Sequence, residues 1–178
     1  YYLSNKYIAT TNIQKNKMED LDEDKYKPVY QDTAVSQEEK CINYDLIYYF
    51  PETQDSSYLM LAGLNINNNE EAEIRTFLGA GQYIYSSEKN MYIATNKTTY
   101  GKGYEVLGGT THLLKIELNN GKFNFKAECN IDGQVNNQFS MDENRDTFRI
   151  ATPTGNIWVD ERTGNSLYIL NDKLVEIG

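Results

Sequence analysis

A short phrase recurs along this chain: an aromatic residue followed by Ile, Ala and Thr. It stands at residues 7–10 and 92–95, in a variant form at residues 148–152, and as a weaker echo at residues 167–170. Each copy follows a polar turn and has the length of one β-strand. A repeated strand–turn–strand unit is typical of proteins that stack several small sheets, because one unit alone cannot bury its hydrophobic face. The phrase therefore predicts an all-β fold.

A hairpin signal supports the same prediction. Asn120 and Gly121 separate two β-prone runs, residues 112–118 and residues 122–127. An Asn-Gly pair between such runs is the strongest short signal for a hairpin, because both turn residues must tolerate a positive φ angle. In the first run, hydrophobic residues alternate with charged ones, among them Lys115. We therefore expect one face of this hairpin to be wet.

Three other segments carry specific expectations. Residues 58–65 are strongly apolar without strict alternation, so we expect a strand that is buried on both faces. Residues 97–109 are rich in Gly and Tyr and are expected to form a loop. The tail, residues 173–177, is expected to add a last strand.

The charge balance restricts the partners. The chain has 17 Lys and Arg against 26 Asp and Glu, a formal net charge of −9. Nucleic-acid binding needs clustered Lys and Arg, and the sequence has no such cluster, so no nucleic-acid partner is expected. No stretch approaches the ~18 apolar residues that a membrane span needs. The most acidic segment, residues 12–27, is expected to be a charged, solvated loop, because it lacks the glycine and alternating oxygen ligands of a calcium loop.

A second motif is more specific. Residues 136–143 are Asn-Asn-Gln-Phe-Ser-Met-Asp-Glu, and residues 148–152 follow as Phe-Arg-Ile-Ala-Thr. Together they resemble the signature of the secreted C-terminal β-propeller family, which is distantly related to WD-40 repeats. Residues 85–95 and residues 166–178 resemble two further segments of that family. The likeness is strong from about residue 73 onward, and weaker but in the same order before it.

The resemblance implies β-propeller-like blades of short antiparallel strands. Family domains are longer than this chain, and at roughly 40–45 residues per blade its 178 residues make about four blades at most. We therefore expect one domain over residues 1–178, an incomplete ring that is the C-terminal part of a longer domain. Exposed blade edges would favour self-association. The resemblance also implies an extracytoplasmic location, secreted or at the cell surface, and no defined reaction.

Polar residues in and near the signature form a candidate ligand site. They are Asn136, Asn137, Gln138, Asp142, Glu143 and Arg149. Such amides and carboxylates could bind a protein or a carbohydrate ligand on a blade rim. Asp142 and Glu143 are also the best candidates for calcium, and no other cofactor is expected. The alternative is structural, because such side chains often cap backbone groups at turns between strands.

The sequence presents no catalytic constellation. His112 is the only histidine, so any catalysis that needs a histidine must use it, but its place on the same strand face as Leu114 favours packing. Cys41 and Cys129 either form one disulfide or remain two small buried residues. We therefore predict a non-catalytic extracytoplasmic binding or scaffold module. The alternative is an extracellular hydrolase acting on carbohydrate or peptide, with a site completed by missing blades.

Overall fold

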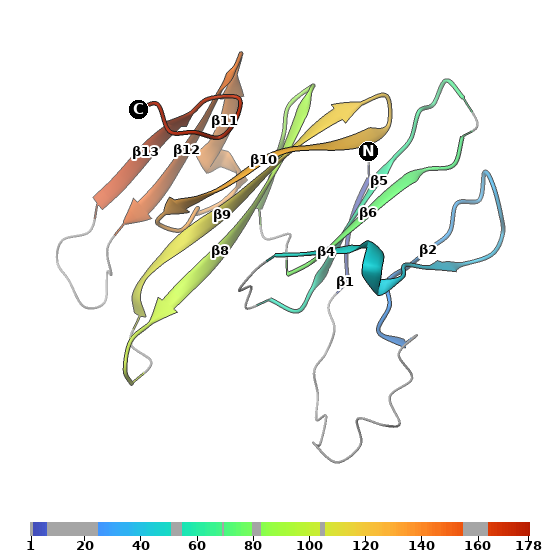
Figure 1. The fold of residues 1–178 in the computed structure, drawn as a ribbon, viewed down its shortest axis with the longest axis horizontal. Coiled ribbons are helices and arrows are strands. Elements are labelled where there is room, and N and C mark those ends of the chain that lie inside the picture. Colours follow the sequence, from blue (N-terminus) through green and yellow to red (C-terminus); the bar gives the residue numbers. More distant parts are fainter. Residues whose placement is uncertain are drawn as a thin grey trace. The chain divides into compact units, whose positions relative to one another are not determined.

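The computed structural model describes residues 2–6, 25–50, 55–68, 70–79, 83–103, 106–154 and 164–178, the first of these ranges by its backbone alone (Figure 1). The chain is all-β, with several small and mostly antiparallel sheets, as the sequence predicts. It divides into two compact units. Unit 1 comprises Tyr1–Ala80 with Asn120–Lys122, and unit 2 comprises Gly81–Asn119 with Phe123–Gly178. The single domain expected over residues 1–178 stays a prediction. The charged segment lies largely outside the described residues.

Unit 1 contains a four-stranded sheet and a two-stranded ribbon. The sheet has the strand order β1-β5-β6-β4, formed by β1 (Tyr2–Lys6), β4 (Ile47–Tyr49), β5 (Tyr58–Gly63) and β6 (Glu73–Leu78). Strand β4 departs from the antiparallel pattern, because it pairs with β6 in the parallel direction. The ribbon pairs β2 (Val29–Tyr30) with β3 (Lys40–Cys41), and a short 3₁₀ helix, η3 (Tyr44–Leu46), precedes β4.

Strand β5 corrects one expectation. Residues 58–65 were expected to be buried on both faces, but only Leu59 and Leu61 have no exposed surface. Met60 and Ala62 alternate with them and remain half-buried on the opposite face. Burial therefore alternates with a period of two from residue 59 to residue 63, although the sequence is apolar throughout. Tyr58, which is in phase with Met60, is buried as expected. The half-buried face forms the floor of a hollow described below.

Unit 2 begins with a four-stranded antiparallel meander. Its strands are β7 (Tyr83–Ser86), β8 (Asn90–Tyr100), β9 (Val106–Asn119) and β10 (Lys122–Asp132), in the order β10-β9-β8-β7. The predicted hairpin turn is confirmed, with φ angles of 48° at Asn120 and 83° at Gly121. The loop expected at residues 97–109 is wrong for most of its length, because Thr98 and Thr99 continue β8 and pair with glycines of β9.

A second meander completes unit 2. It consists of a 3₁₀ turn, η4 (Gln138–Ser140), and the strands β11 (Met141–Asn144), β12 (Thr147–Thr154) and β13 (Gly164–Leu170), in the order β11-β12-β13. The tail then turns back and forms a bridge between Leu170 and Glu176. The Ile177 N–H donates to the Ile169 carbonyl at 2.8 Å. The strand expected over residues 173–177 is therefore wrong for most of its length, because the tail turns and returns to β13 through an isolated bridge, and the sheet keeps three strands.

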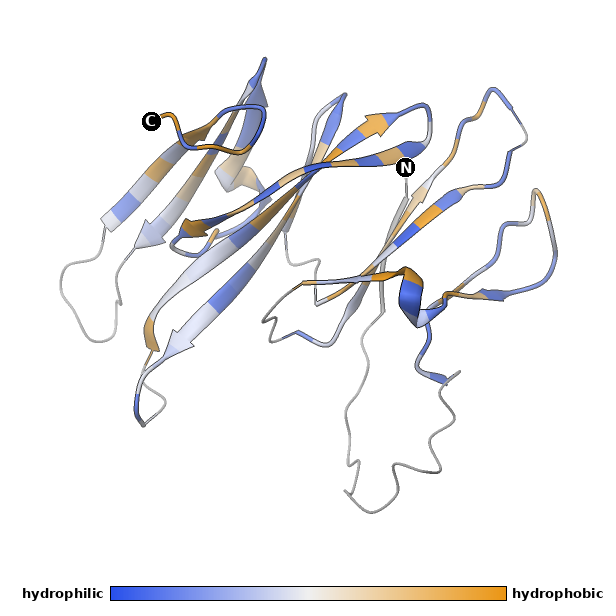
Figure 2. Ribbon diagram, viewed as in Figure 1, coloured by the Kyte–Doolittle hydropathy of each residue, from blue (hydrophilic) through white to orange (hydrophobic). Residues whose placement is uncertain are grey.

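The two sheets of unit 2 share a hydrophobic core. Tyr92 of β8 stacks on Phe148 of β12, with ring centroids 3.8 Å apart and an angle of 15° between the ring planes. Both residues belong to copies of the recurring phrase. Ala94 and Leu113 from one sheet and Ile150 from the other are fully buried in the same cluster. Two meanders thus pack against each other, while the turns between β7 and β8 and between β11 and β12 are hydrophilic (Figure 2).

Candidate functional site

Strand β11 divides the predicted ligand site between its two faces. Asp142 and Glu143 are neighbours on this strand, and consecutive side chains of a strand point to opposite faces. Glu143 points toward the β7–β10 sheet, whereas Asp142 lies on the outer face of the β11–β13 sheet. The six predicted residues therefore do not converge on one ligand. Calcium ligation by the Asp142 and Glu143 side chains together would require a rearrangement of the strand.

Glu143 is the centre of a buried polar network. Its carboxylate accepts hydrogen bonds from the Tyr92 hydroxyl at 2.6 Å, from the Asn90 amide at 2.7 Å, and from the Ser87 hydroxyl. Its own N–H donates to the Tyr85 hydroxyl at 3.1 Å, and its side chain is only 9% exposed. Burial, together with the hydrogen bond to Glu143, raises the pKa of Tyr92 far above its ordinary value. Tyr92 therefore remains a donor at any physiological pH.

Lys115 extends this network and corrects another expectation. Its side chain is 3% exposed, and its Nζ lies 2.5 Å from Asp172 Oδ1 and 4.0 Å from Glu143 Oε1. The wet face expected for the hairpin is thus wrong for β9, because Lys115 lies directly opposite Tyr92 on the face that meets the second sheet. Two carboxylates compensate the cost of burying its charge. In turn, the hydrogen bond from Lys115 lowers the pKa of Asp172.

The other predicted residues have structural or exposed positions. Arg149 stands opposite Asp142 and donates through Nε to Oδ1 at 2.8 Å and through Nη2 to Oδ2. The Asn137 side chain caps η4 by accepting the Phe139 N–H at 2.9 Å. The backbone-capping alternative is therefore what the structure shows for this residue. Asn136 and Gln138 are exposed beside it.

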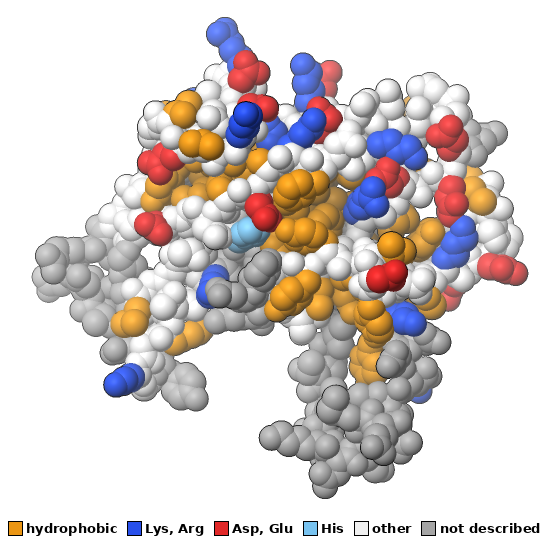
Figure 3. Space-filling view, viewed as in Figure 1, with side chains coloured by type: hydrophobic (Ala, Val, Ile, Leu, Met, Phe, Trp, Pro, Cys, Tyr) orange, Lys and Arg blue, Asp and Glu red, His pale blue; other side chains and the backbone are white. Residues whose placement is uncertain are grey.

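A charged groove opens beside the buried network, within unit 2. Its volume is about 690 Å³. The turn between β7 and β8, the turn between β11 and β12, and the chain after β13 all contribute to it. The lining residues are Ser87, Glu88, Lys89, Asn90, Lys115, Glu117, Lys126, Glu143, Arg145, Asp146 and Asp172. Figure 3 shows side chains of both charges crowded at the upper edge of the view.

Sequence reasoning found only one residue of this groove, Glu143. It missed Lys115 and Asp172, which are 57 positions apart. The sequence offered one signal: a single lysine amid the hydrophobic residues of a central strand needs a partner charge. No local pattern could identify that partner as Asp172. Among the residues that the structure describes, no group of three His, Cys, Asp or Glu side chains could hold a metal ion.

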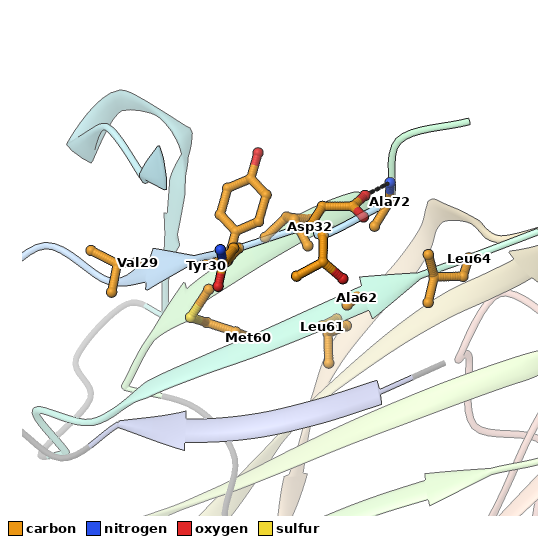
Figure 4. Close-up of a pocket in the computed structure, with 11 residues that line it drawn as sticks. Val29, Tyr30, Asp32, Met60, Leu61, Ala62, Leu64 and Ala72 are labelled. Atoms are coloured by element: carbon orange, nitrogen blue, oxygen red, sulfur yellow. Dashed lines mark hydrogen bonds between the residues drawn. The ribbon is translucent and has the colours of Figure 1, made fainter. Parts of the chain in front are cut away.

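Unit 1 has a hollow of its own, with a volume of about 440 Å³ (Figure 4). Its floor includes Met60, Ala62 and Leu64, on and just after β5, and Tyr30 and Asp32 stand over it. The Asp32 carboxylate accepts the Ala72 N–H at 2.9 Å, as the dashed line in Figure 4 marks. This hydrogen bond ties the chain before β6 to the chain after β2. The hollow is mainly apolar and contains no residue of the predicted site.

The histidine and the cysteines stand outside both hollows. His112 contacts Asn130 Oδ1 through Nδ1 at 2.9 Å and Glu128 Oε2 through Nε2 at 3.4 Å, so it is packed among polar neighbours. Burial raises the pKa of the Cys129 thiol to about 11, which leaves it protonated and unreactive at neutral pH. Both cysteines are free thiols in the structure, Cys41 exposed in unit 1 and Cys129 partly buried in unit 2. Cys41 is thus not the small buried residue expected from the sequence as one alternative.

The packed meanders define a class of protein made of small antiparallel sheets in face-to-face contact, each built around a copy of the same strand phrase. A family model described as "Beta propeller domain" matches residues 1–178, and the chain belongs to this family. The comparison with curated proteins found no match, and neither did the comparison with solved structures. Membership supports a general role as a binding or scaffold module. No helix in the described part of the chain is long and apolar enough to cross a membrane.

Proposed function

We propose that the chain is a non-catalytic, extracytoplasmic binding module that takes a segment of a protein ligand into the charged groove. The observation that carries this proposal is the groove itself. Turns from the two sheets of unit 2 meet there, and the buried side chains of Lys115 and Glu143 form part of the lining between them. Extracytoplasmic location is supported by the resemblance of residues 136–143 to the secreted members of the family.

The lining favours protein over carbohydrate. Sugar sites commonly use an aromatic ring against the apolar face of the sugar, and no residue that lines the groove is aromatic. Instead Lys89, Lys126 and Arg145 alternate with carboxylates such as Glu88 and Asp146. A peptide segment with charges of both signs offers the complementary pattern, and such complementarity supplies specificity and association rate.

The groove's most buried ions favour binding over catalysis. The Glu143 carboxylate already accepts three hydrogen bonds from side chains, and the Lys115 ammonium already pairs with Asp172. Groups committed in this way shape a surface and hold its turns in place. A general acid or base would instead be free to exchange its proton with a substrate.

A peptide-display experiment tests the proposal. A random displayed peptide library is selected on the immobilised chain, and an enriched peptide is titrated by calorimetry. Lys126→Glu should weaken its binding by about fivefold or more, because the variant reverses one charge of the groove. Lys102→Glu is the matched control, because Lys102 is exposed at the opposite end of the β8–β9 hairpin.

Other outcomes of this experiment contradict the proposal. Failure to enrich any peptide, or equal affinities for both variants, would place the ligand elsewhere. Binding to a glycan array that Lys126→Glu abolishes would replace protein by carbohydrate. Recovery of the peptide in cleaved form would favour the hydrolase. Release of the native protein by protease treatment of intact cells tests the extracytoplasmic location separately.

A further inference from the structure

Lys115 is a buried cation in the lining of the charged groove. Its side chain is 3% exposed, and its Nζ donates to the Asp172 carboxylate at 2.5 Å and to the Asp172 carbonyl at 3.3 Å. The nearby Glu143 carboxylate is 4.0 Å away and already accepts hydrogen bonds from three side chains. The Asp172 carboxylate is therefore the closest compensation for a charge that is shielded from water.

The two partners of this ion pair differ sharply in exposure. The Asp172 side chain is 75% exposed, so the place that its carboxylate holds beside Lys115 opens to the groove. An exposed carboxylate is well hydrated outside its ion pair, so turning away into water costs Asp172 little. Lys115 has no such alternative, because it remains buried when its partner leaves.

The turn that carries Asp172 is fixed independently of the ion pair. The Asn171 side chain accepts the Lys173 N–H at 2.9 Å. Leu174 is buried in the core of unit 2 with a φ of 58°, a conformation that residues other than glycine seldom adopt. The backbone of the turn therefore stays in place when only the Asp172 side chain moves, and its carbonyl still holds Lys115.

We propose that the Asp172 carboxylate occupies the place of a ligand carboxylate, and that the segment bound in the groove carries an acidic group that displaces it and pairs with Lys115. This inference rests on the proposed function, because it names the chemistry of the segment that the groove takes up. One carboxylate replaces another, so the charge beside Lys115 is unchanged and no proton moves. A neutral group in that place would leave Lys115 without its close partner, and this cost selects for an acid.

Acetate tests the exchange without any peptide. Asp172→Ala removes the resident carboxylate, so acetate should bind beside Lys115 and stabilise the folded chain. At pH 7 and about 0.2 M salt, replacing chloride by acetate should raise the melting temperature of Asp172→Ala by about 2 °C more than that of the wild type. The double variant Asp172→Ala with Lys115→Met should lose this effect. Asp172→Ser replaces Asp172→Ala if the alanine variant does not fold.

The matched control lies outside the groove. Asp142→Ala also removes an acid that pairs with a base, but both side chains of that pair are nearly half exposed. Exposed ion pairs contribute little, so acetate should affect this variant no more than the wild type.

A second arm uses a peptide enriched from the displayed library. Changing its acid to the amide, at a Glu or Asp side chain or at the C-terminus, should weaken binding to the wild type by about tenfold or more. These separate changes distinguish a side-chain acid from a terminal one. Asp172→Asn should instead strengthen binding by about threefold or more, because the competing carboxylate is gone. Asp142→Asn removes the same charge outside the groove and should leave the affinity unchanged.

Several results would overturn the proposal. One is an acetate effect in Asp172→Ala that equals the wild type or persists in the double variant. Others are a peptide that binds equally well when all its carboxylates are amidated, and weaker binding to Asp172→Asn, which would make Asp172 a direct ligand contact. If no peptide is enriched, the proposed function fails, while the acetate arm still supports or excludes the exchange at Lys115.

Discussion

Two adjacent acids on β11 offer a stringent test of the buried network. Glu143→Ala removes the acceptor of the Tyr92 hydroxyl, which is fully buried and cannot turn to water. A buried donor without a partner costs about 1–3 kcal/mol. Asn90 also loses its acceptor, and Lys115 loses one of its two neighbouring carboxylates. Summing these effects, we expect Glu143→Ala to lower the free energy of unfolding by roughly 3 kcal/mol.

The matched control is the same substitution one residue earlier. Asp142→Ala removes a carboxylate of the same β11 strand, but its ion pair with Arg149 is nearly half exposed. Exposed ion pairs contribute little to stability, so no change beyond experimental error is expected. Both variants are measured by urea unfolding, followed by circular dichroism at a concentration where the chain is monomeric. Equal losses of stability for the two variants, or an unchanged stability for Glu143→Ala, would refute the claim that the hydrogen bonds of Glu143 stabilise the fold.

A double-mutant cycle then isolates the central hydrogen bond. Tyr92→Phe removes the donor, so Glu143→Ala should cost about 1 kcal/mol less in that background than in the wild type. The two substitutions would be additive if the hydroxyl and the carboxylate did not interact. In that case the loss caused by Glu143→Ala would have to arise from Lys115 or Asn90 alone.

Three further predictions concern backbone, thiols and pH. Gly133→Ala should lower the free energy of unfolding by about 2 kcal/mol or more, because the new Cβ would lie 2.5 Å from the Thr152 hydroxyl and the φ of +87° disfavours any side chain. Gly103→Ala is the control in the same thermal unfolding experiment. It should cost only about 1 kcal/mol, because the space around it is open. A thiol reagent should modify exposed Cys41 rapidly and Cys129 only after unfolding, whereas no reaction with either would reveal a disulfide. Because the pKa of Tyr92 is raised in the folded chain, its contribution to stability is complete below the pKa of an unfolded tyrosine. This contribution is lost as the pH rises above about 10. When the free energy of unfolding is measured at increasing alkaline pH, Tyr92→Phe should therefore show a shallower decline than the wild type.

Strand content was the most predictable property. The recurring phrase and the Asn120–Gly121 turn depend on local preferences, namely β-prone side chains and tolerance of positive φ. The turn is confirmed, and so are the strands at residues 92–95, 148–152 and 167–170, whereas the copy at residues 7–10 lies outside the described residues. The loop expected at residues 97–109 was wrong because glycines were taken as chain breakers. A paired neighbouring strand can hold Gly108 in place even with a φ of 145°.

The candidate site was predictable only in part. One of its two signature acids, Glu143, lines the charged groove, but its neighbour Asp142 faces the other way. Asn137 proved to be a turn cap. From the sequence, a polar string between strands has the same appearance whether it binds a ligand or caps a backbone. The decision depends on which donors approach it from other strands.

The sequence by itself determined that this protein is all-β and repeats one strand unit, because hydrophobic alternation and turn chemistry act over a few residues. The tertiary structure alone decided which face of each strand is covered. Lys115 is buried because Glu143 and Asp172, from distant parts of the chain, lie beside it. The groove likewise joins turns that are far apart in sequence. Such pairings depend on the packing of one sheet against another, and no local preference encodes them.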